Sequence, residues 1–344
     1  MRTDPSLAPT GMPWIAASAD ELLAGATSRT ALNPDDGKSG SRFERVVIDG
    51  QPYFAKSLSR STDWITRVIH DPDSWTLRIW KAGLMHAAPA EIDHTVVGMA
   101  LDGDGETARL TMLMHDVRDH LIPEGDDAVT ERQHLALLDG LAALCARFWN
   151  WEDALGLCSL AHRFRFFAPD NIQPELDRVA TPDELPVPIR VADEGWRRLP
   201  DRSPLLARLT ATVHAEPRPL ESALRSTPQT FLHGDWKMGN LGVHPDGRTI
   251  LLDWAYPGAG PACLDLAWYL SLNRARLPIT KEATIDVFRD ALERRGIPTD
   301  DWFERQLELS LLGMAATFGW EKAVGDEDEL RWWEDAAVRG SRWL

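Results

Sequence analysis

Three side chains able to take part in phosphoryl chemistry stand close together in the segment FLHGDWKMGN: Asp235, Lys237 and Asn240. A further carboxylate, Asp253, ends the next apolar run. Mg²⁺ accepts carboxylate and amide oxygens as ligands, together with water and substrate phosphates. A carboxylate beside such an ion can orient a hydroxyl and accept its proton. With a lysine to neutralise a moving phosphoryl group, these residues are the components of phosphoryl transfer, which depends mostly on positioning and charge neutralisation.

The residues between these groups predict a β-hairpin. Leu241–Val243 and Thr249–Leu252 are short apolar runs, and the Asp246-Gly247 dipeptide is typical of the turn between two strands. A hairpin returns its second end to its first, so we expect Asp253 beside Asp235. A lone HGD segment is also common in ordinary surface turns. Its occurrence together with the hairpin and the second Asp favours a site.

The first third of the chain predicts a small sheet. Phe43–Ile48 and Tyr53–Leu58 alternate as hairpin strands, and Thr95–Ala100 and Ala108–Leu113 predict two more strands. Thr62–Leu84 predicts a helix that breaks at an Asp-Pro pair. Residues 1–30 predict a loose or helical lead-in, with a short helix over 18–24.

The rest of the chain is mainly helical in pattern. Thr130–Trp149 carries one apolar stripe at three- and four-residue spacing, which is typical of a long helix buried on one face. Residues 168–204 are rich in Pro and Asp and predict an irregular insertion, such as a lid. The fold class is therefore α+β, with a β-rich lobe over 1–115 and a mainly helical lobe over 116–344. Further helices are predicted over 204–214, 219–224, 263–273, 281–294 and 301–320.

HGDWKMGN resembles the catalytic loop of the aminoglycoside phosphotransferase and choline kinase-like family, which has a protein-kinase-like two-lobe fold. In that family a His precedes the catalytic Asp by two residues and an Asn follows it by five, as His233 and Asn240 stand around Asp235. LLDWA resembles the metal-binding segment and delivers Asp253. GPACLDLAWYL resembles the next segment, where an Asp braces the loop, a role that falls on Asp265. His233 is likewise assigned to support of the loop.

The resemblance implies transfer of the γ-phosphate of ATP to a small-molecule hydroxyl, with Mg²⁺. Asp235 is then the base, Lys237 assists the phosphoryl group, and Asn240 and Asp253 hold the metal. The strand residue Lys56 is expected to bind the α- and β-phosphates. The remaining nucleotide-binding candidates are Gly37, Ser39 and Gly40 in the loop DGKSGSRFERV, and Met114, Asp116 and Val117 in the connection between lobes.

One departure from the family pattern concerns the partner of Lys56. The fold normally pairs this lysine with a Glu on the following helix, and no Glu occurs between Ser57 and Ala90. Asp73 substitutes, or Glu91 does, or the lysine has no partner. This departure supports an alternative function, a catalytically weak nucleotide-binding or regulatory module. A hydrolase is a third alternative, but the sequence supplies neither a second metal cluster nor an activated Ser or Cys.

Composition restricts the partners. The 344 residues carry a net charge of −16, which argues against nucleic acid as a partner. The charge is compatible with a cationic acceptor, although an acidic surface often serves solubility alone. No long uncharged apolar run predicts a membrane span, and the first residues lack a secretory pattern. Three widely spaced cysteines favour a cytoplasmic protein with reduced thiols. The acceptor stays open among aminoglycosides, amino alcohols and sugars, and the oligomeric state is undetermined.

Overall fold

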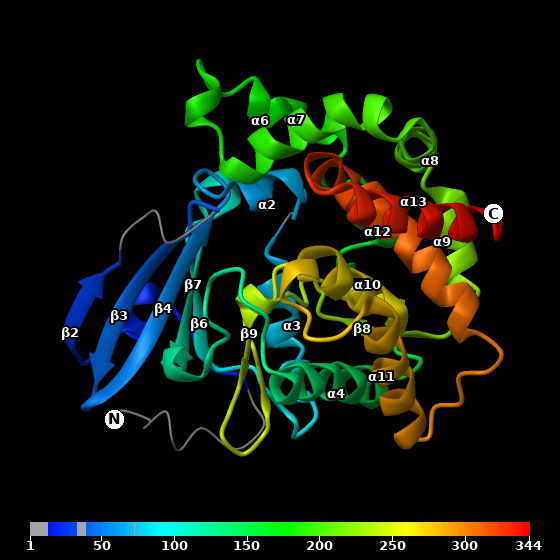
Figure 1. The fold of residues 1–344 in the computed structure, drawn as a ribbon. Coiled ribbons are helices and arrows are strands. Elements are labelled where there is room, and N and C mark those ends of the chain that lie inside the picture. Colours follow the sequence, from blue (N-terminus) through cyan, green and yellow to red (C-terminus); the bar gives the residue numbers. More distant parts are fainter. Residues whose placement is uncertain (1–12, 33–38, 72) are drawn as a thin grey trace.

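The N-terminal lobe is built on a mainly antiparallel sheet that carries the predicted strands. The computed structural model describes residues 13–32, 39–71 and 73–344. Within these residues the sheet has six strands in the order β1-β6-β7-β4-β3-β2 (Figure 1). The strands are β1 Ile15–Ala16, β2 Ala26–Ala31, β3 Arg42–Ile48, β4 Gln51–Ser59, β6 Val96–Asp102 and β7 Arg109–His115. The four predicted strands of this lobe are confirmed as β3, β4, β6 and β7.

Alternation along β4 decides which way its lysine points. Ala55 is buried in a small apolar cluster with Val46, Ile48 and Leu113. Because successive strand residues face opposite sides of a sheet, Lys56 projects from the other face, toward the C-terminal lobe. Strands β1 and β2 were not predicted. The sequence of β2 is exposed over nearly its whole length, so it lacks the alternating apolar pattern by which a strand is recognised.

Two short helices follow the Lys56 strand. They are α2 Trp64–Val68 and α3 Trp75–Lys81, and the predicted break lies between them. The short helix predicted near the N-terminus is also present, as α1 Ala19–Leu22. Side-chain caps begin α2 and α3. Asp63 accepts from the Thr66 N–H, and Ser74 accepts from the Leu77 N–H.

The C-terminal lobe is mainly helical, as predicted, but the expected irregular insertion is wrong. Residues 168–204 contain α6 Pro169–Leu176 and α7 Val187–Arg202. Each helix has Pro in its first turn, where the missing N–H costs nothing, and each holds another Pro further along, Pro174 and Pro200. The prolines that suggested irregularity therefore lie both at helix starts and within helices. The other helices are α4 Glu131–Arg147, α5 Leu160–Arg165, α8 Pro204–Ala215, α9 Arg218–Arg225, α10 Ala262–Leu272, α11 Lys281–Arg294, α12 Phe303–Val324 and α13 Glu327–Ser341.

Short strands position the predicted loop inside this lobe. The hairpin β9 Leu241–Val243 and β10 Thr249–Leu251 forms as predicted. A second pair joins β8 Gln229–Leu232 to β11 Gly258–Pro261. Strand β5, Ile92–Asp93, pairs in parallel with β10, so a segment from the first 115 residues completes a sheet of the second lobe. The division at residues 115 and 116 therefore stays a prediction.

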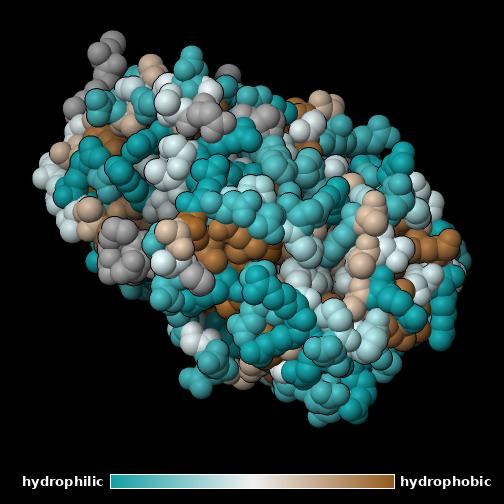
Figure 2. Space-filling model, turned by 90° about the horizontal axis from the view of Figure 1, so that it is seen from above, coloured by the Kyte–Doolittle hydropathy of each residue, from teal (hydrophilic) through white to brown (hydrophobic). Residues whose placement is uncertain are grey.

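One large apolar core runs through the C-terminal lobe and reaches α2, α3 and the inner face of the sheet. Seen from above, the surface is mostly hydrophilic, and hydrophobic side chains show chiefly in a recess near the middle (Figure 2). Among the described residues, no helix is long and apolar enough to cross a membrane.

The packing of α7 against α12 yields a test of the fold. Gly195 lies so close to α12 that an added Cβ would overlap the Trp320 carbonyl. Alanine is the better helix former by about 1 kcal/mol, so a loss of stability in Gly195→Ala must come from this contact. We expect the free energy of unfolding to fall by about 1–3 kcal/mol, measured by denaturant titration. Arg197→Ala, on an exposed part of the same helix, should change it little, and a stabilised Gly195→Ala would contradict the packing.

Candidate active site

A buried carboxylate holds the start of the loop that follows β8. Asp265, in the first turn of α10, accepts hydrogen bonds from the backbone N–H groups of His233 and Gly234, at 2.9 and 3.0 Å. Gly234 has φ of +84°, and an added Cβ would overlap the Tyr256 carbonyl and the Arg163 guanidinium. Only glycine fits this turn. The structure thus places Asp265 behind the loop, where the sequence predicted a brace.

His233 connects the loop to the strand that precedes Asp253. Its Nε2 lies 3.0 Å from the Leu252 carbonyl, and its Nδ1 accepts the Asp235 N–H at 3.2 Å. Burial lowers the pKa of His233 to about 3, so the ring is neutral and Nε2 carries the proton that it donates to the carbonyl. Its position agrees with the predicted supporting role.

Asp235 is buried, with 1% of its surface exposed, and three donors fix its carboxylate. Oδ2 accepts from Lys237 Nζ at 2.7 Å and from Asn240 Nδ2 at 2.8 Å. Oδ1 accepts from the Trp268 indole N–H at 2.9 Å. An ionised carboxylate has about four acceptor positions, so one remains for the hydroxyl of an incoming molecule. Although burial favours a neutral amine, the Asp235 carboxylate raises the pKa of Lys237 above its usual value, which keeps the amine charged.

Trp268 was missed from the sequence, yet a signal for it was present. It stands three residues after Asp265 on α10, and residues three apart share a helix face. One face of α10 therefore presents a carboxylate to the start of the loop and an indole N–H to Asp235. Recognising it required the orientation of the helix relative to the loop.

Asn240 and Asp253 fit the predicted metal ligands. The Asn240 amide nitrogen donates to Asp235, which leaves its oxygen free to face the other way. Asp253 uses Oδ1 for Lys56, and no hydrogen bond to its Oδ2 is found among the described residues. Two hard oxygen donors at the ends of one hairpin suit Mg²⁺, which usually takes few protein ligands. In the described part of the chain, no cluster of three or more His, Cys, Asp or Glu could hold a metal.

The partner of Lys56 is Asp253, at 2.7 Å. Neither predicted substitute pairs with it, because Asp73 binds Arg78 and Glu91 lies toward Arg295. Burial alone would raise the pKa of Asp253, but the Lys56 ammonium holds it below its usual value. The lysine is therefore fixed by the carboxylate that follows the hairpin, an arrangement that no pattern within the N-terminal lobe encodes.

A cavity of about 310 Å³ lies between the lobes and brings most predicted nucleotide-binding residues together. Phe54, Val96 and Met112 supply an apolar wall, and Trp254 lies at the end that carries the polar residues. Such a shape, apolar with a few convergent polar groups, is typical of a small-molecule site. The predicted residues in its lining are Ser39, Lys56, Met114, Asp116, Val117, Lys237, Asn240 and Asp253.

The predicted phosphate loop is described only in part. Gly37 lies outside the described residues. Ser39 lines the cavity, whereas Gly40 does not. Gly40 has φ of +92°, and an added Cβ would overlap the Thr62 carbonyl. This glycine allows the loop to approach the start of α2 rather than the cavity.

A buried arginine lies under the loop. Arg163 on α5 is 2% exposed and donates through Nη2 to the Tyr256 carbonyl. Its Nε and Nη1 have no hydrogen-bond partner within the described part of the chain. Burial raises the pKa of Asp265 to about 6, and the Arg163 charge and the two backbone N–H groups act against that rise. Arg163 thus stabilises the ionised brace and ties the segment after Asp253 to α5.

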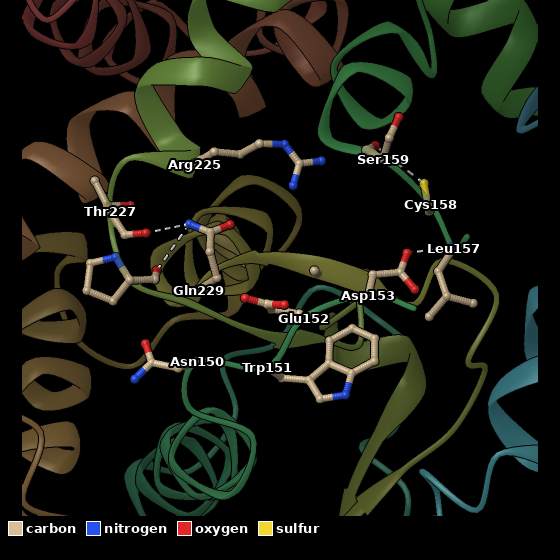
Figure 3. Close-up of a pocket in the computed structure, with 12 residues that line it drawn as sticks. Asn150, Trp151, Glu152, Asp153, Leu157, Cys158, Ser159, Arg225, Thr227 and Gln229 are labelled. Atoms are coloured by element: carbon tan, nitrogen blue, oxygen red, sulfur yellow. Dashed lines mark hydrogen bonds between the residues drawn. The ribbon is translucent and has the colours of Figure 1, made fainter. Parts of the chain in front are cut away.

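A larger cavity, of about 560 Å³, contains none of the predicted residues. It lies beside β8 and β11 and includes Asp153, Arg225 and Gln229 (Figure 3). Several of its polar groups already have local partners, although the Gln229 Oε1 has none among the described residues. Asp153 accepts from two backbone N–H groups of its own turn, and the Gln229 amide nitrogen donates to nearby carbonyls. We therefore place the chemistry at the smaller cavity.

Comparison with protein families agrees with this geometry. The model of the phosphotransferase enzyme family matches residues 45–306, which is most of the chain. The chain belongs to this family, and it is a phosphotransferase. Among curated protein sequences, none matches the chain significantly.

Solved structures share the fold at low sequence identity. LicA in complex with AMP is 12% identical, with 92% of this chain and 91% of that chain covered and a TM-score of 0.50. A microcompartment-associated aminopropanol kinase is 15% identical, with 94% of each chain covered and a TM-score of 0.48. An aminoglycoside phosphotransferase from Streptomyces rimosus, in complex with ADP and streptomycin, is 19% identical, with 82% and 94% covered and a TM-score of 0.46. LicA thus shares the fold of this chain.

The Trp268–Asp235 contact leads to a prediction. Trp268→Phe keeps an aromatic ring but removes a hydrogen bond to a charged group, worth about 1.5–3 kcal/mol. We expect kcat for phosphotransfer to fall about 10–100-fold, with the KM for nucleotide unchanged, measured by ADP release. Trp333→Phe is the matched control, because the Trp333 indole donates to Glu329 on α13 and not to a residue of the site. Equal losses in both variants would show that Trp268 acts only through stability.

Proposed function

We propose that this enzyme transfers the γ-phosphate of ATP to the hydroxyl of a small, amine-bearing molecule in a Mg²⁺-dependent reaction. The observation that carries the proposal is the fixed, buried carboxylate of Asp235, which is bonded to Lys237 and Asn240. Both of these residues line the interlobe cavity together with Asp253. A binding module has no need for a carboxylate held by three donors. The alternative of a weak binding module drew on the missing helix Glu, and Lys56 has a carboxylate partner in Asp253.

Each polar residue of the site has a separate task in this proposal. Asp235 orients the acceptor hydroxyl and takes its proton through its remaining acceptor position. Lys237, 36% exposed at its side chain, lies between Asp235 and the cavity and neutralises charge on the transferring group. Lys56 binds the α- and β-phosphates of the nucleotide. Asn240 and Asp253 would hold Mg²⁺, which when bound neutralises phosphate oxygens.

A buried cluster of aromatic rings that includes Trp268, the indole partner of Asp235, supports an amine-bearing acceptor. Trp268 lies 5.9 Å from Tyr256 and 4.8 Å from Phe318, measured between ring centroids. Phe166 lies 5.2 Å from Tyr256. Ring faces attract organic cations, and Trp268 connects this cluster to the Asp235 carboxylate. A small amino alcohol satisfies both features, because its hydroxyl and its ammonium stand a few bonds apart.

The test combines a panel of acceptors with substitution of Asp235, the proposed catalytic base. Purified protein is incubated with ATP, Mg²⁺ and single acceptors (amino alcohols, aminoglycosides, sugars), and phosphorylated product is detected by mass. We expect an amino alcohol to be phosphorylated and Asp235→Asn to lower kcat about 10²–10⁴-fold. Asp246→Asn, in the exposed hairpin turn, is the control. Full turnover by Asp235→Asn would remove Asp235 from the base role, and phosphorylation of sugars alone would refute the amine-bearing acceptor.

The metal assignment has its own test. Chelation with EDTA should abolish phosphotransfer, and added Mg²⁺ should restore it. Asp253→Asn retains one oxygen but loses its charge, so we expect the Mg²⁺ concentration for half-maximal rate to rise at least about tenfold, since hard cations favour charged oxygens. Rates are followed against free Mg²⁺ at saturating ATP. Undiminished activity in EDTA would exclude a metal-dependent reaction at this site.

A further inference from the structure

The helices that follow the Lys56 strand bind the C-terminal lobe. On α3, Thr76 donates to the Trp254 carbonyl at 2.8 Å, and Arg78 donates to the Leu155 carbonyl at 3.0 Å. These helices lie where the family normally supplies an acid to the strand lysine, and here Asp253 has that place. The segment between β4 and β5 is therefore available for a different structural task.

A bidentate ion pair connects helix α2 to α6. Arg67 donates to Glu175 through Nε at 2.7 Å and through Nη2 at 2.6 Å. The Glu175 side chain is 5% exposed and that of Arg67 17%. Asn171, one turn earlier on α6, donates to the Val68 carbonyl at 3.0 Å and accepts from His70 Nε2 at the same distance. In Figure 1, α2 and α6 meet at the top of the view, away from β9.

The other end of α2 holds the phosphate loop. Asp63, 3% exposed, caps α2 and also accepts from Ser41 Oγ at 2.8 Å. Ser41 Oγ lies 2.9 Å from Ser39 Oγ, and the Trp64 N–H donates to the Ser39 carbonyl at 3.1 Å. Since the Ser41 proton is used by the Asp63 carboxylate, Ser39 donates to Ser41. Gly40 permits the close approach described above.

We propose that α2 is a strut that sets the position of the phosphate loop from the C-terminal lobe, with Glu175 and Arg67 as positioning residues for the nucleotide phosphates. The connection runs from Glu175 through Arg67 along five helical residues to Asp63, Ser41 and Ser39, which lines the nucleotide cavity. This inference rests on the proposed function, because it assigns nucleotide phosphates to that cavity.

Geometry explains why this ion pair can act as a fixed joint. A planar guanidinium that binds both oxygens of one carboxylate fixes direction as well as distance. The pair is largely removed from water, so it is screened little by salt. Helix α2 is a single turn, with the Arg67–Glu175 pair at one end and the Asp63–Ser41 contact at the other. Because a hydrogen-bonded helical turn is rigid, a displacement of α6 also moves Ser41.

The experiment separates binding of the nucleotide phosphates from binding of the adenosine part. Affinities for ADP and for adenosine are measured by titration calorimetry on wild type, Glu175→Gln and Arg67→Lys. Arg67→Lys keeps the charge and loses the fork. We expect both variants to bind ADP at least about fivefold more weakly, within the usual range of coupling between sites, and to bind adenosine as wild type does. Ser41→Ala, a buried change at the other end of the strut, should give the same pattern.

Arg178→Gln is the matched control, because Arg178 also contacts Glu175 at 3.1 Å but lies three residues from it in the same lobe. It should leave both affinities unchanged. Unaltered ADP affinity in Glu175→Gln and Arg67→Lys would overturn the strut, as would equal weakening of adenosine and ADP. If wild type binds neither ADP nor ATP, the proposed function itself fails. If wild type binds ADP and the variants lose affinity for ADP and adenosine equally, only the strut proposal is refuted and the proposed function stands.

Discussion

The geometry of the site depends on one buried carboxylate that accepts two consecutive backbone N–H groups. Asp265 fixes the peptide planes on both sides of His233, and Gly234 supplies the backbone turn that lets the chain enter this position. The direction in which Asp235 leaves the loop follows from those two planes. Burial opposes the ionised form of Asp265, so the N–H groups and Arg163 are needed to keep it charged. Removing any of these partners would strain the whole loop.

Much of the site could be predicted because its information is local. The loop, the hairpin and Asp253 lie within a short stretch, and turn chemistry alone brings its ends together. The strand bearing Lys56 was likewise predictable from alternation with buried neighbours. The family match over residues 45–306 and the kinase-like fold confirm the class of protein that this stretch indicated. The individual roles of the site residues remain proposals, supported by their positions.

What escaped prediction depends on contacts between distant segments. The partner of Lys56 lies in the other lobe, and a search confined to the nearest helix could only suggest Asp73 or Glu91. Trp268 reaches Asp235 because α10 packs in one particular orientation. Strand β2 has an exposed sequence without a pattern. Residues 168–204 were misjudged because proline counts as a breaker in composition. Proline is compatible with the first turn of a helix, and α6 and α7 also hold Pro174 and Pro200 further along.

The pairing of β5 with β10 has a mechanical consequence. This pairing, with the covalent connection after β7, attaches the lobes along one edge, and the α2–α6 contact attaches them along another. Contacts of α3 and the Lys56–Asp253 ion pair also cross between the lobes. All of these side-chain contacts can separate while the backbone ladder of β5 and β10 stays intact. Opening of the lobes therefore requires the release of several side-chain contacts together, and lobe opening of this kind limits product release in many enzymes.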